Sequence, residues 1–205
     1  MTTARHSRRK SKGFRRFLRF IYFILAMTVS ALLIWGAIQL LSDTKEKTLN
    51  SLYPVKYEEY VNKAARDYNM DKALIYGVIR TESGFNPEAE SSAGARGLMQ
   101  IMPESFQWLQ TIRGVEGEYT DDDLYDPEIN IDYGVYLLKY FYDRYGTEQT
   151  AVAAYNAGFV VGDWLSNPDY STDGVVLDYI PYPETSAYVD KVLSAKDKYK
   201  ELYFN

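Results

Sequence analysis

Residues 82–103, ESGFNPEAESSAGARGLMQIMP, are the stretch on which the interpretation of this chain depends. One acid, Glu82, ends an apolar helical pattern, and a loop rich in Gly, Ser, Ala and Asn follows it. The stretch closes with the alternating Leu, Met, Gln, Ile and Met side chains of residues 98–102. A loop of this length is usually functional or disordered, and its apolar residues argue against disorder. We therefore interpret residues 82–103 as the wall and floor of a binding site.

Glu82 continues the apolar stripe of the helix that precedes it. The stripe consists of Leu74, Ile75, Val78 and Ile79. Glu82 follows Val78 by four residues and Ile79 by three, so it lies on the same helix face. Burial and the negative end of the helix dipole both disfavour a carboxylate and raise its pKa. A protonated Glu can donate a proton to a leaving oxygen and then take one back.

An isolated Glu at a helix end more often turns to solvent, and only the loop that follows favours a functional role. Its hydroxyls, amide, glycines and Met side chains suit a sugar, which has hydroxyl groups at its rim and a weakly apolar ring face. The sequence therefore predicts Glu82 as a candidate acid beside a sugar-binding loop.

The rest of the body shows helical periodicity and no sustained period-2 alternation, so the fold class is mainly α. Residues 159–183, with three prolines and several Asp and Gly, are expected to be irregular. Caps and breakers such as Asp71, Gly84 and Asp126 mark the helix ends. The expected helices cover residues 54–68, 71–83, 103–109, 126–146, 147–158 and 184–203.

The amino-terminal part of the chain has the pattern of a membrane anchor. Residues 1–19 form a basic tail with eight Lys or Arg and no acid, and residues 20–41 carry no charge. Twenty-two such residues are enough for a helical membrane span, with the basic tail on the cytoplasmic side. A cleaved signal peptide is the alternative, although its apolar core is normally shorter. Residues 42–54 are expected to be a short polar linker, and residues 55–205 the catalytic domain.

Charge and composition exclude several kinds of site. Residues 42–205 hold 15 Lys or Arg and all 28 acidic residues, a net charge of −13, which disfavours nucleic acid as a ligand. The chain has no Cys, and His6 in the basic tail is its only His, so a thiolate site or a His-based zinc site in the body is excluded. The acidic run at 121–123 lacks the ligand spacing of an EF-hand. We expect neither a metal nor a cofactor.

Four ordered blocks resemble the motifs of Slt-type lytic transglycosylases. Residues 82–103 are similar to the central signature of that family, with ESGFNP, then Ser91, then GARGLMQIMP. The other three blocks are Asn130 to Leu137, Ala154 to Gly158 (AYNAG) and Glu184 to Val192. The resemblance covers about residues 56–200, which is nearly the whole body.

The resemblance implies an α-helical lysozyme-like fold and a reaction on peptidoglycan glycan strands. Members of the family cleave the β-1,4 bond between N-acetylmuramic acid and N-acetylglucosamine without water and leave a 1,6-anhydromuramoyl end. By position, Glu82 is similar to the single catalytic acid and base, and Tyr155 faces it as a second catalytic residue. The positions similar to substrate-binding residues are Ser91, Gln100, Met102, Asn156 and Glu184. The expected location is the cell membrane, crossed once, with the catalytic domain on the cell-wall side.

Each of these residues also has an ordinary structural explanation. Ser91 and Gln100 are suited to hydrogen bonds within the loop, and Met102 to the core. Asn156 fits a helix end, and Glu184 fits the first turn of a helix. Two other functions stay open from the sequence. One is a hydrolase of the goose-type lysozyme kind on the same substrate, and the other is a catalytically silent peptidoglycan-binding module.

Overall fold

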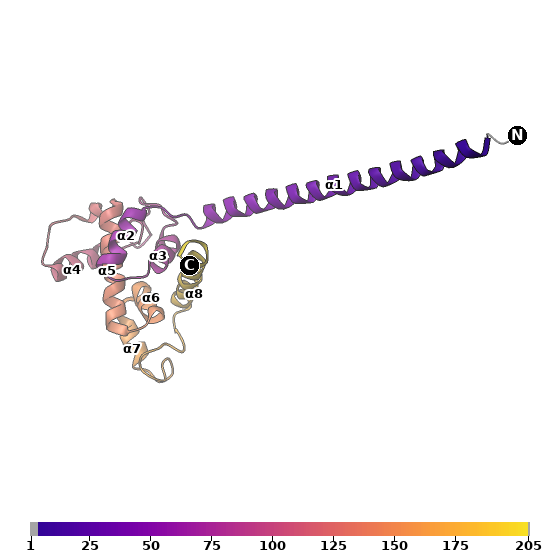
Figure 1. Cartoon of the computed structure of the whole chain (residues 1–205). Helices are drawn as coiled ribbons and strands as arrows, with labels where there is room; N and C mark the ends of the chain where they lie inside the picture. The colour runs from indigo at the N-terminus through magenta and orange to yellow at the C-terminus, as the bar shows by residue number, and fades with distance from the viewer. Residues whose placement is uncertain (1–3, 205) are drawn as a thin grey trace. The chain divides into compact units, whose positions relative to one another are not determined.

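The structure is a computed structural model that describes residues 4–204, apart from the side chains of residues 4–12, 43, 45 and 46. The chain divides after Pro54 into two units, residues 1–54 and 55–205 (Figure 1). Part of the expected basic tail lies outside the described residues, namely residues 1–3 and the side chains of Arg5, Arg8, Arg9, Lys10 and Lys12.

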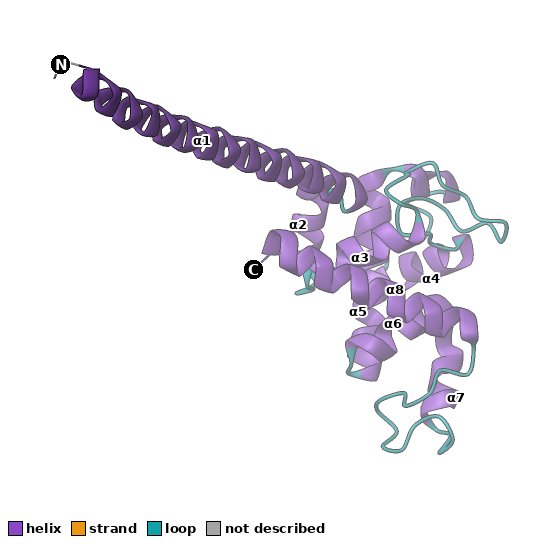
Figure 2. Cartoon of the chain, turned by 90° about the vertical axis from the view of Figure 1, so that its right-hand side faces the viewer, coloured by secondary structure: helices purple, strands orange, loops and turns teal. Residues whose placement is uncertain are grey.

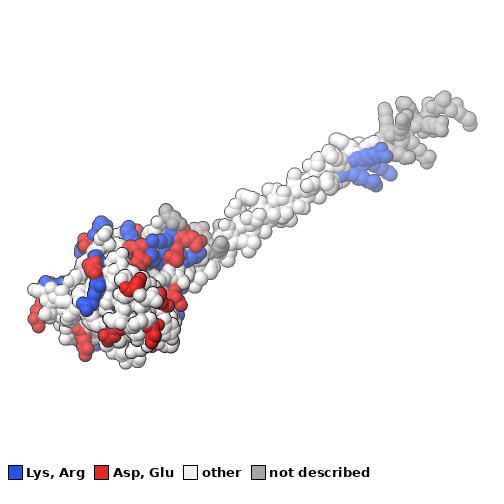
Figure 3. All heavy atoms as spheres, turned by 90° about the horizontal axis from the view of Figure 1, so that it is seen from below, with Lys and Arg blue, Asp and Glu red and all other residues white. Residues whose placement is uncertain are grey.

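The first unit contains one long helix, α1 (Ala4–Leu52). Its segment Gly13–Leu52 includes a stretch of 18 residues with a mean hydropathy of 2.2. No residue of that stretch is buried. In Figure 3 the middle of the described part of this helix carries no charged side chain. Lys or Arg side chains lie beyond the apolar stretch. By length and composition, Gly13–Leu52 is able to cross a membrane, and a signal sequence passes the same test.

The expected linker is helical over most of its length. Residues 42–52 continue α1 without a break, and their role as a linker stays a prediction. The physical reason is local, because this segment contains neither Gly nor Pro until Pro54, and a proline disfavours helix at the residue before it. Thr44 and Thr48 also bond their hydroxyls to the carbonyls four residues back, which is compatible with the helix.

The second unit is built from helices joined by loops, with no strand among residues 55–204 (Figure 2). The prediction of a mainly α fold is therefore confirmed. The α-helices are α2 (Glu58–Asp67), α3 (Lys72–Glu82), α4 (Pro103–Arg113), α5 (Pro127–Tyr145), α6 (Glu148–Ala157), α7 (Val161–Leu165) and α8 (Pro183–Tyr199). Two short 3-10 helices, η1 (Asp121–Tyr125) and η2 (Gly158–Val160), and a closing π-helix, η3 (Lys200–Phe204), complete the chain.

The helix ends follow the chemistry of their caps. The Asp71 side chain accepts a hydrogen bond from the Ala73 amide at 2.9 Å and starts α3. Asp126 caps α5 in the same way. The first helix of the body begins at Glu58 rather than at Pro54, and residues 159–165, which we expected to be irregular, lie in η2 and α7.

Helix α6 and the contact between α3 and α8 are closely packed parts of the body. The residues Ala151 to Ala154 of α6 are fully buried, as expected for a helix of small side chains at the centre of a bundle. Helix α3 lies directly against α8 at Gly77, where an added Cβ would be 2.8 Å from the carbonyl oxygen of Val192. Because only glycine fits there, the carboxyl-terminal end of α3 is held close to α8.

Candidate active site

Glu82 is the last residue of α3, and its carboxylate meets a side chain from α8. The phenol of Tyr188 donates a hydrogen bond to Oε1 of Glu82 at 2.6 Å. Tyr188 is buried, and Glu82 is partly buried. Desolvation raises the pKa of Glu82 to about 7, while the hydrogen bond from Tyr188 opposes this rise because it favours the carboxylate. Glu82 is thus balanced between its protonated and ionised forms near neutral pH.

Tyr155 of α6 completes the group around Glu82. Its hydroxyl donates a hydrogen bond to the carbonyl oxygen of Met99 at 2.8 Å. Burial, and then the negative charge of Glu82, hold the pKa of Tyr155 well above its usual value. The pKa of Tyr188 is raised well above its usual value for the same reasons, with Tyr155 as a further contributor. Both phenols therefore stay neutral and serve as hydrogen-bond donors.

The loop after Glu82 is fixed to the body by buried polar contacts. Ser83 donates a hydrogen bond to the carbonyl oxygen of Leu98 at 2.7 Å and ties the two ends of the loop together. Asn130 of α5, fully buried, accepts from the Met99 amide at 2.7 Å and donates to the carbonyl oxygens of Leu124 and Arg96. These bonds hold the backbone of Met99 where its carbonyl meets Tyr155.

Gly97 makes this close approach of loop and helix α5 possible. Its φ is +76°, and an added Cβ would lie 2.2 Å from both Nδ2 of Asn130 and the carbonyl oxygen of Leu124. A side chain at this position is therefore excluded by space as well as by backbone conformation.

Ser91 and Gln100 bond within the loop. The Ser91 hydroxyl accepts from the Ala95 amide at 3.0 Å. The Gln100 amide donates to the carbonyl oxygens of Ala89 and Gly97, each at 3.0 Å, and its backbone has a φ of +50°. The ordinary explanation given above holds for both side chains in this structure, and their contact with substrate stays a prediction.

The other predicted residues lie at helix ends and are exposed. Met102 is the N-cap residue of α4 and is 37% exposed. Asn156 lies near the end of α6, and its Oδ1 accepts a hydrogen bond from Thr185 of α8 at 2.7 Å. Glu184 is exposed in the first turn of α8. The Asn156–Thr185 bond joins the two helices that carry Tyr155 and Tyr188, so it steadies both phenols relative to Glu82.

Tyr188 was not among the site residues predicted from the sequence, although it belongs to the fourth motif block together with Glu184. That block was the one available signal, since a contact across 106 positions leaves no local pattern.

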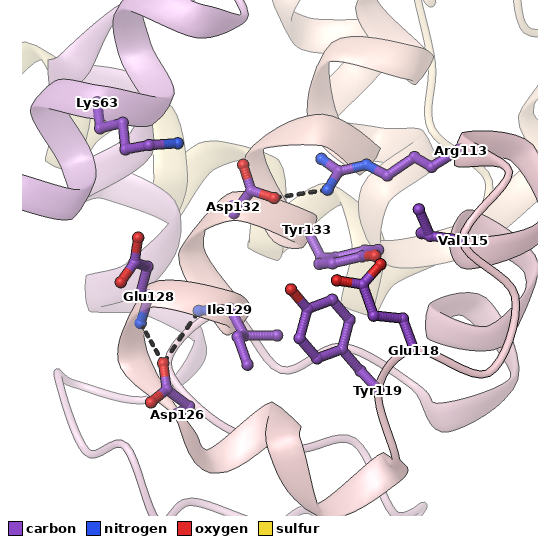
Figure 4. A pocket seen from close by; sticks show the side chains of 10 residues that line it. All are labelled: Lys63, Arg113, Val115, Glu118, Tyr119, Asp126, Glu128, Ile129, Asp132 and Tyr133. Atoms are coloured by element: carbon purple, nitrogen blue, oxygen red, sulfur yellow. Dashed lines mark hydrogen bonds and ion pairs between the residues drawn. The ribbon is translucent and has the colours of Figure 1, made fainter.

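A pocket of about 490 Å³ elsewhere in the body is separate from this group (Figure 4). Its wall contains Arg113, whose guanidinium is paired with Asp132 and lies 4.1 Å and 4.3 Å from the ring centroids of Tyr133 and Tyr136. The pocket holds none of the predicted site residues, and its main cation is already neutralised. Among the described residues, no group of three or more His, Asp or Glu is placed to hold a metal ion.

The comparisons with known proteins agree with this arrangement. The family model "Transglycosylase SLT domain" matches residues 59–173. The soluble lytic murein transglycosylase of Escherichia coli K12 is 33% identical over 155 residues, which cover 74% of this chain and 24% of that protein. A membrane-bound lytic murein transglycosylase C of Actinobacillus succinogenes is 36% identical over 125 residues, 56% of this chain and 35% of that protein.

A solved structure of a lytic transglycosylase is also similar to this chain. The inactive glutamate-to-glutamine variant of the lytic transglycosylase Slt from Pseudomonas aeruginosa has a TM-score of 0.63 and 27% identity, over 74% of this chain and 25% of that one. This chain spans about a quarter of the length of the soluble relative and of the solved structure. The match to more than half of its residues shows that the chain belongs to the transglycosylase SLT domain family.

Proposed function

We propose that this chain is a membrane-anchored peptidoglycan lytic transglycosylase. Its reaction cleaves the β-1,4 bond between N-acetylmuramic acid and N-acetylglucosamine and forms a 1,6-anhydromuramoyl end. The observation that carries the proposal is the partly buried Glu82, with a pKa of about 7 and a 2.6 Å hydrogen bond from Tyr188. No other described carboxylate contributes to the pKa of Glu82, which supports a reaction with one catalytic carboxylate rather than the usual pair.

In the first step, protonated Glu82 donates its proton to the glycosidic oxygen as the bond to the anomeric carbon breaks. The 2-acetamido carbonyl of the substrate stabilises the positive charge on that carbon. The Tyr155 phenol gives its one proton to the Met99 carbonyl, so in this proposal its oxygen accepts a hydrogen bond from the acetamido N–H and orients the group.

In the second step, the Glu82 carboxylate takes the proton of the muramoyl 6-hydroxyl, and the oxygen of that group bonds to the anomeric carbon. Glu82 ends the cycle protonated, and no water enters the products. The Tyr188 hydrogen bond stabilises the carboxylate between the two steps, while desolvation favours the acid at the start and the end. A pKa of about 7 suits both roles of the one side chain.

The relatives support the reaction class. Those named above are lytic transglycosylases, and the Pseudomonas aeruginosa structure is of an inactive protein in which glutamine replaces a glutamate. We transfer that requirement to Glu82 because it is the carboxylate at the end of α3 with the raised pKa.

The proposed anchor is the apolar part of α1. The 22 uncharged residues 20–41 span about 33 Å as a helix, which is enough to cross the roughly 30 Å hydrocarbon core of a bilayer. The basic residues before the apolar stretch favour a cytoplasmic amino terminus, and hence a catalytic body on the cell-wall side. The membrane-bound relative from Actinobacillus succinogenes is consistent with this location.

The test is a digest of purified peptidoglycan by the full-length chain in detergent, compared with Glu82→Gln and analysed by mass spectrometry. We expect muropeptides one water molecule lighter than hydrolysis products from the wild type, and none from the variant. Hydrated products would show a goose-type hydrolase instead. Binding to sacculi without any product from the wild type would show a silent binding module.

A further inference from the structure

Residues 170–179 form a loop that projects from the body next to α7 (Figure 2). The carbonyl oxygen of Tyr170 accepts hydrogen bonds from the amides of Asp178 and Tyr179, at 2.9 Å and 3.2 Å. These bonds join the two ends of the segment, so its side chains lie close together on one small surface. Compact surface loops whose ends meet in this way are frequently functional. We call residues 170–179 the closed loop.

The closed loop is fixed to the body by buried groups. The Thr150 hydroxyl of α6 donates a hydrogen bond to the carbonyl oxygen of Val175 at 3.3 Å. The Leu177 side chain is buried, and the hydroxyl of Ser171, a buried residue, donates to the carbonyl oxygen of Val176 at 2.6 Å. The backbone of the closed loop is therefore ordered without a ligand, and such a surface binds at a lower cost in entropy.

Two large apolar side chains of the closed loop are in contact with solvent. Tyr179 is 57% exposed and Val175 is 47% exposed. The ring centroid of Tyr179 lies 6.0 Å from that of Tyr170, and this tilted contact restrains the exposed ring. A single exposed apolar residue needs no explanation, but two of them on one ordered loop are typical of an interaction surface.

The charged side chains of the closed loop are both carboxylates. Oδ1 of Asp173 accepts hydrogen bonds from the amides of Val175 and Val176, each at 2.8 Å. Oδ2 of Asp178 accepts one from the amide of Thr172, also at 2.8 Å. Both carboxylates are exposed, and no ion pair among the described residues includes either of them. The loop thus orients two carboxylates whose second oxygens point to no cation of this chain.

The charge around the closed loop restricts what binds there. Residues 145–190 contain seven acidic residues and no Lys, Arg or His. That charge disfavours an anionic lipid surface and also a second copy of this acidic body. A guanidinium group fits, because it bonds to a carboxylate with two N–H groups and stacks its plane on an aromatic ring.

We propose that the closed loop is a docking site for an arginine-rich segment of another protein. Guanidinium groups of that segment bond to the carboxylates of Asp173 and Asp178 and stack on the ring of Tyr179. Val175 packs against the aliphatic part of an arginine side chain. Lysine fits less well, because its ammonium group is a point charge without a plane to stack. The docking site recruits a partner and takes no part in the cleavage of glycan.

The test measures the binding of two peptides, nona-arginine and nona-lysine, to the full-length chain in a non-ionic detergent by calorimetry. The salt concentration is about 0.15 M, which screens distant charges. We expect nona-arginine to bind more tightly than nona-lysine. The double variant Asp173→Asn, Asp178→Asn keeps the acceptors that shape the loop, and Tyr179→Leu keeps an apolar side chain without the aromatic ring. Each should weaken nona-arginine binding about tenfold, equivalent to about 1.4 kcal/mol.

The double variant Glu116→Gln, Glu118→Gln is the matched control, since it removes two exposed carboxylates from another loop of the body. Equal losses in the two double variants would overturn the proposal, because they would show attraction to the acidic body as a whole. Equal affinity for the two peptides, or no binding of nona-arginine, would overturn it as well. Binding of a peptide-free murein octasaccharide that Tyr179→Leu abolishes, without binding of nona-arginine, would identify a sugar-binding surface instead. The peptidoglycan digest is separate from this test, so its result leaves the docking site open to measurement.

Discussion

Oε1 of Glu82 lies 2.6 Å from the hydroxyl of Tyr188, a residue 106 positions later in the chain. This contact joins the end of α3 to α8 and couples the protonation of the candidate acid to one phenol. Burial raises the pKa of Glu82 and the phenol lowers it, so the pKa of about 7 results from two opposed effects. Each effect is open to separate measurement.

Tyr188→Phe removes the hydrogen bond but keeps the ring. The pKa of Glu82 should then rise above about 7, because the carboxylate loses its donor while desolvation remains. In the wild type, kcat/KM should fall above about pH 7 as Glu82 loses its proton, and in the variant this fall should move to higher pH. The measurement is the pH dependence of kcat/KM for glycan release. Tyr182→Phe is the control, and an unshifted profile in Tyr188→Phe would contradict the coupling.

Glu82→Gln should change how the stability of the chain depends on pH. The pKa of Glu82 is higher in the folded chain, about 7, than its ordinary value of 4.5. Its contribution to the free energy of unfolding is therefore complete below about pH 4.5 and is lost as the pH rises through about 7. That loss is at most about 3 kcal/mol. Urea unfolding of both proteins at several pH values measures it, and parallel pH curves would refute the raised pKa.

Gly97→Ala and Gly94→Ala form a matched pair, since both positions have a positive φ. At Gly97 the new methyl group would lie 2.2 Å from Asn130 and from the carbonyl oxygen of Leu124, whereas at Gly94 no atom lies within 4 Å. We expect Gly94→Ala to cost about 1–2 kcal/mol of stability and Gly97→Ala more than about 3 kcal/mol. Thermal unfolding followed by circular dichroism gives both values. Similar losses would mean that the contact with Asn130 is unimportant.

Gly77→Ala should separate α3 from α8. The added Cβ would lie 2.8 Å from the carbonyl oxygen of Val192, so the helices must move apart. Because Glu82 and Tyr188 lie on these helices, we expect at least about a tenfold loss of kcat with a smaller change in KM. Steady-state kinetics on soluble glycan strands tests this. Gly36→Ala in α1, where no atom lies within 4 Å of an added Cβ, should leave both constants unchanged.

The sequence by itself determined the elements of the body and the identity of its candidate acid. Caps such as Asp71 and Asp126 act on amides only a few residues away, so the helix starts can be predicted from local sequence. The position of Glu82 on the core face of α3 can be predicted in the same way, from the spacing of its apolar neighbours. Local sequence also explains why the expected linker is helical up to Leu52, because nothing in residues 42–52 ends a helix.

Only the tertiary structure decided which groups act on one another. The bond of Tyr188 to Glu82, the bond of Asn130 to Met99 and the bond of Tyr155 to the Met99 carbonyl all join residues far apart in the chain. Hydrogen bonds of this kind depend on how closely the helices and loops pack, and that distance is set by the whole core. Periodicity shows which face of a helix is buried, but the residue that it meets there follows only from the packed fold.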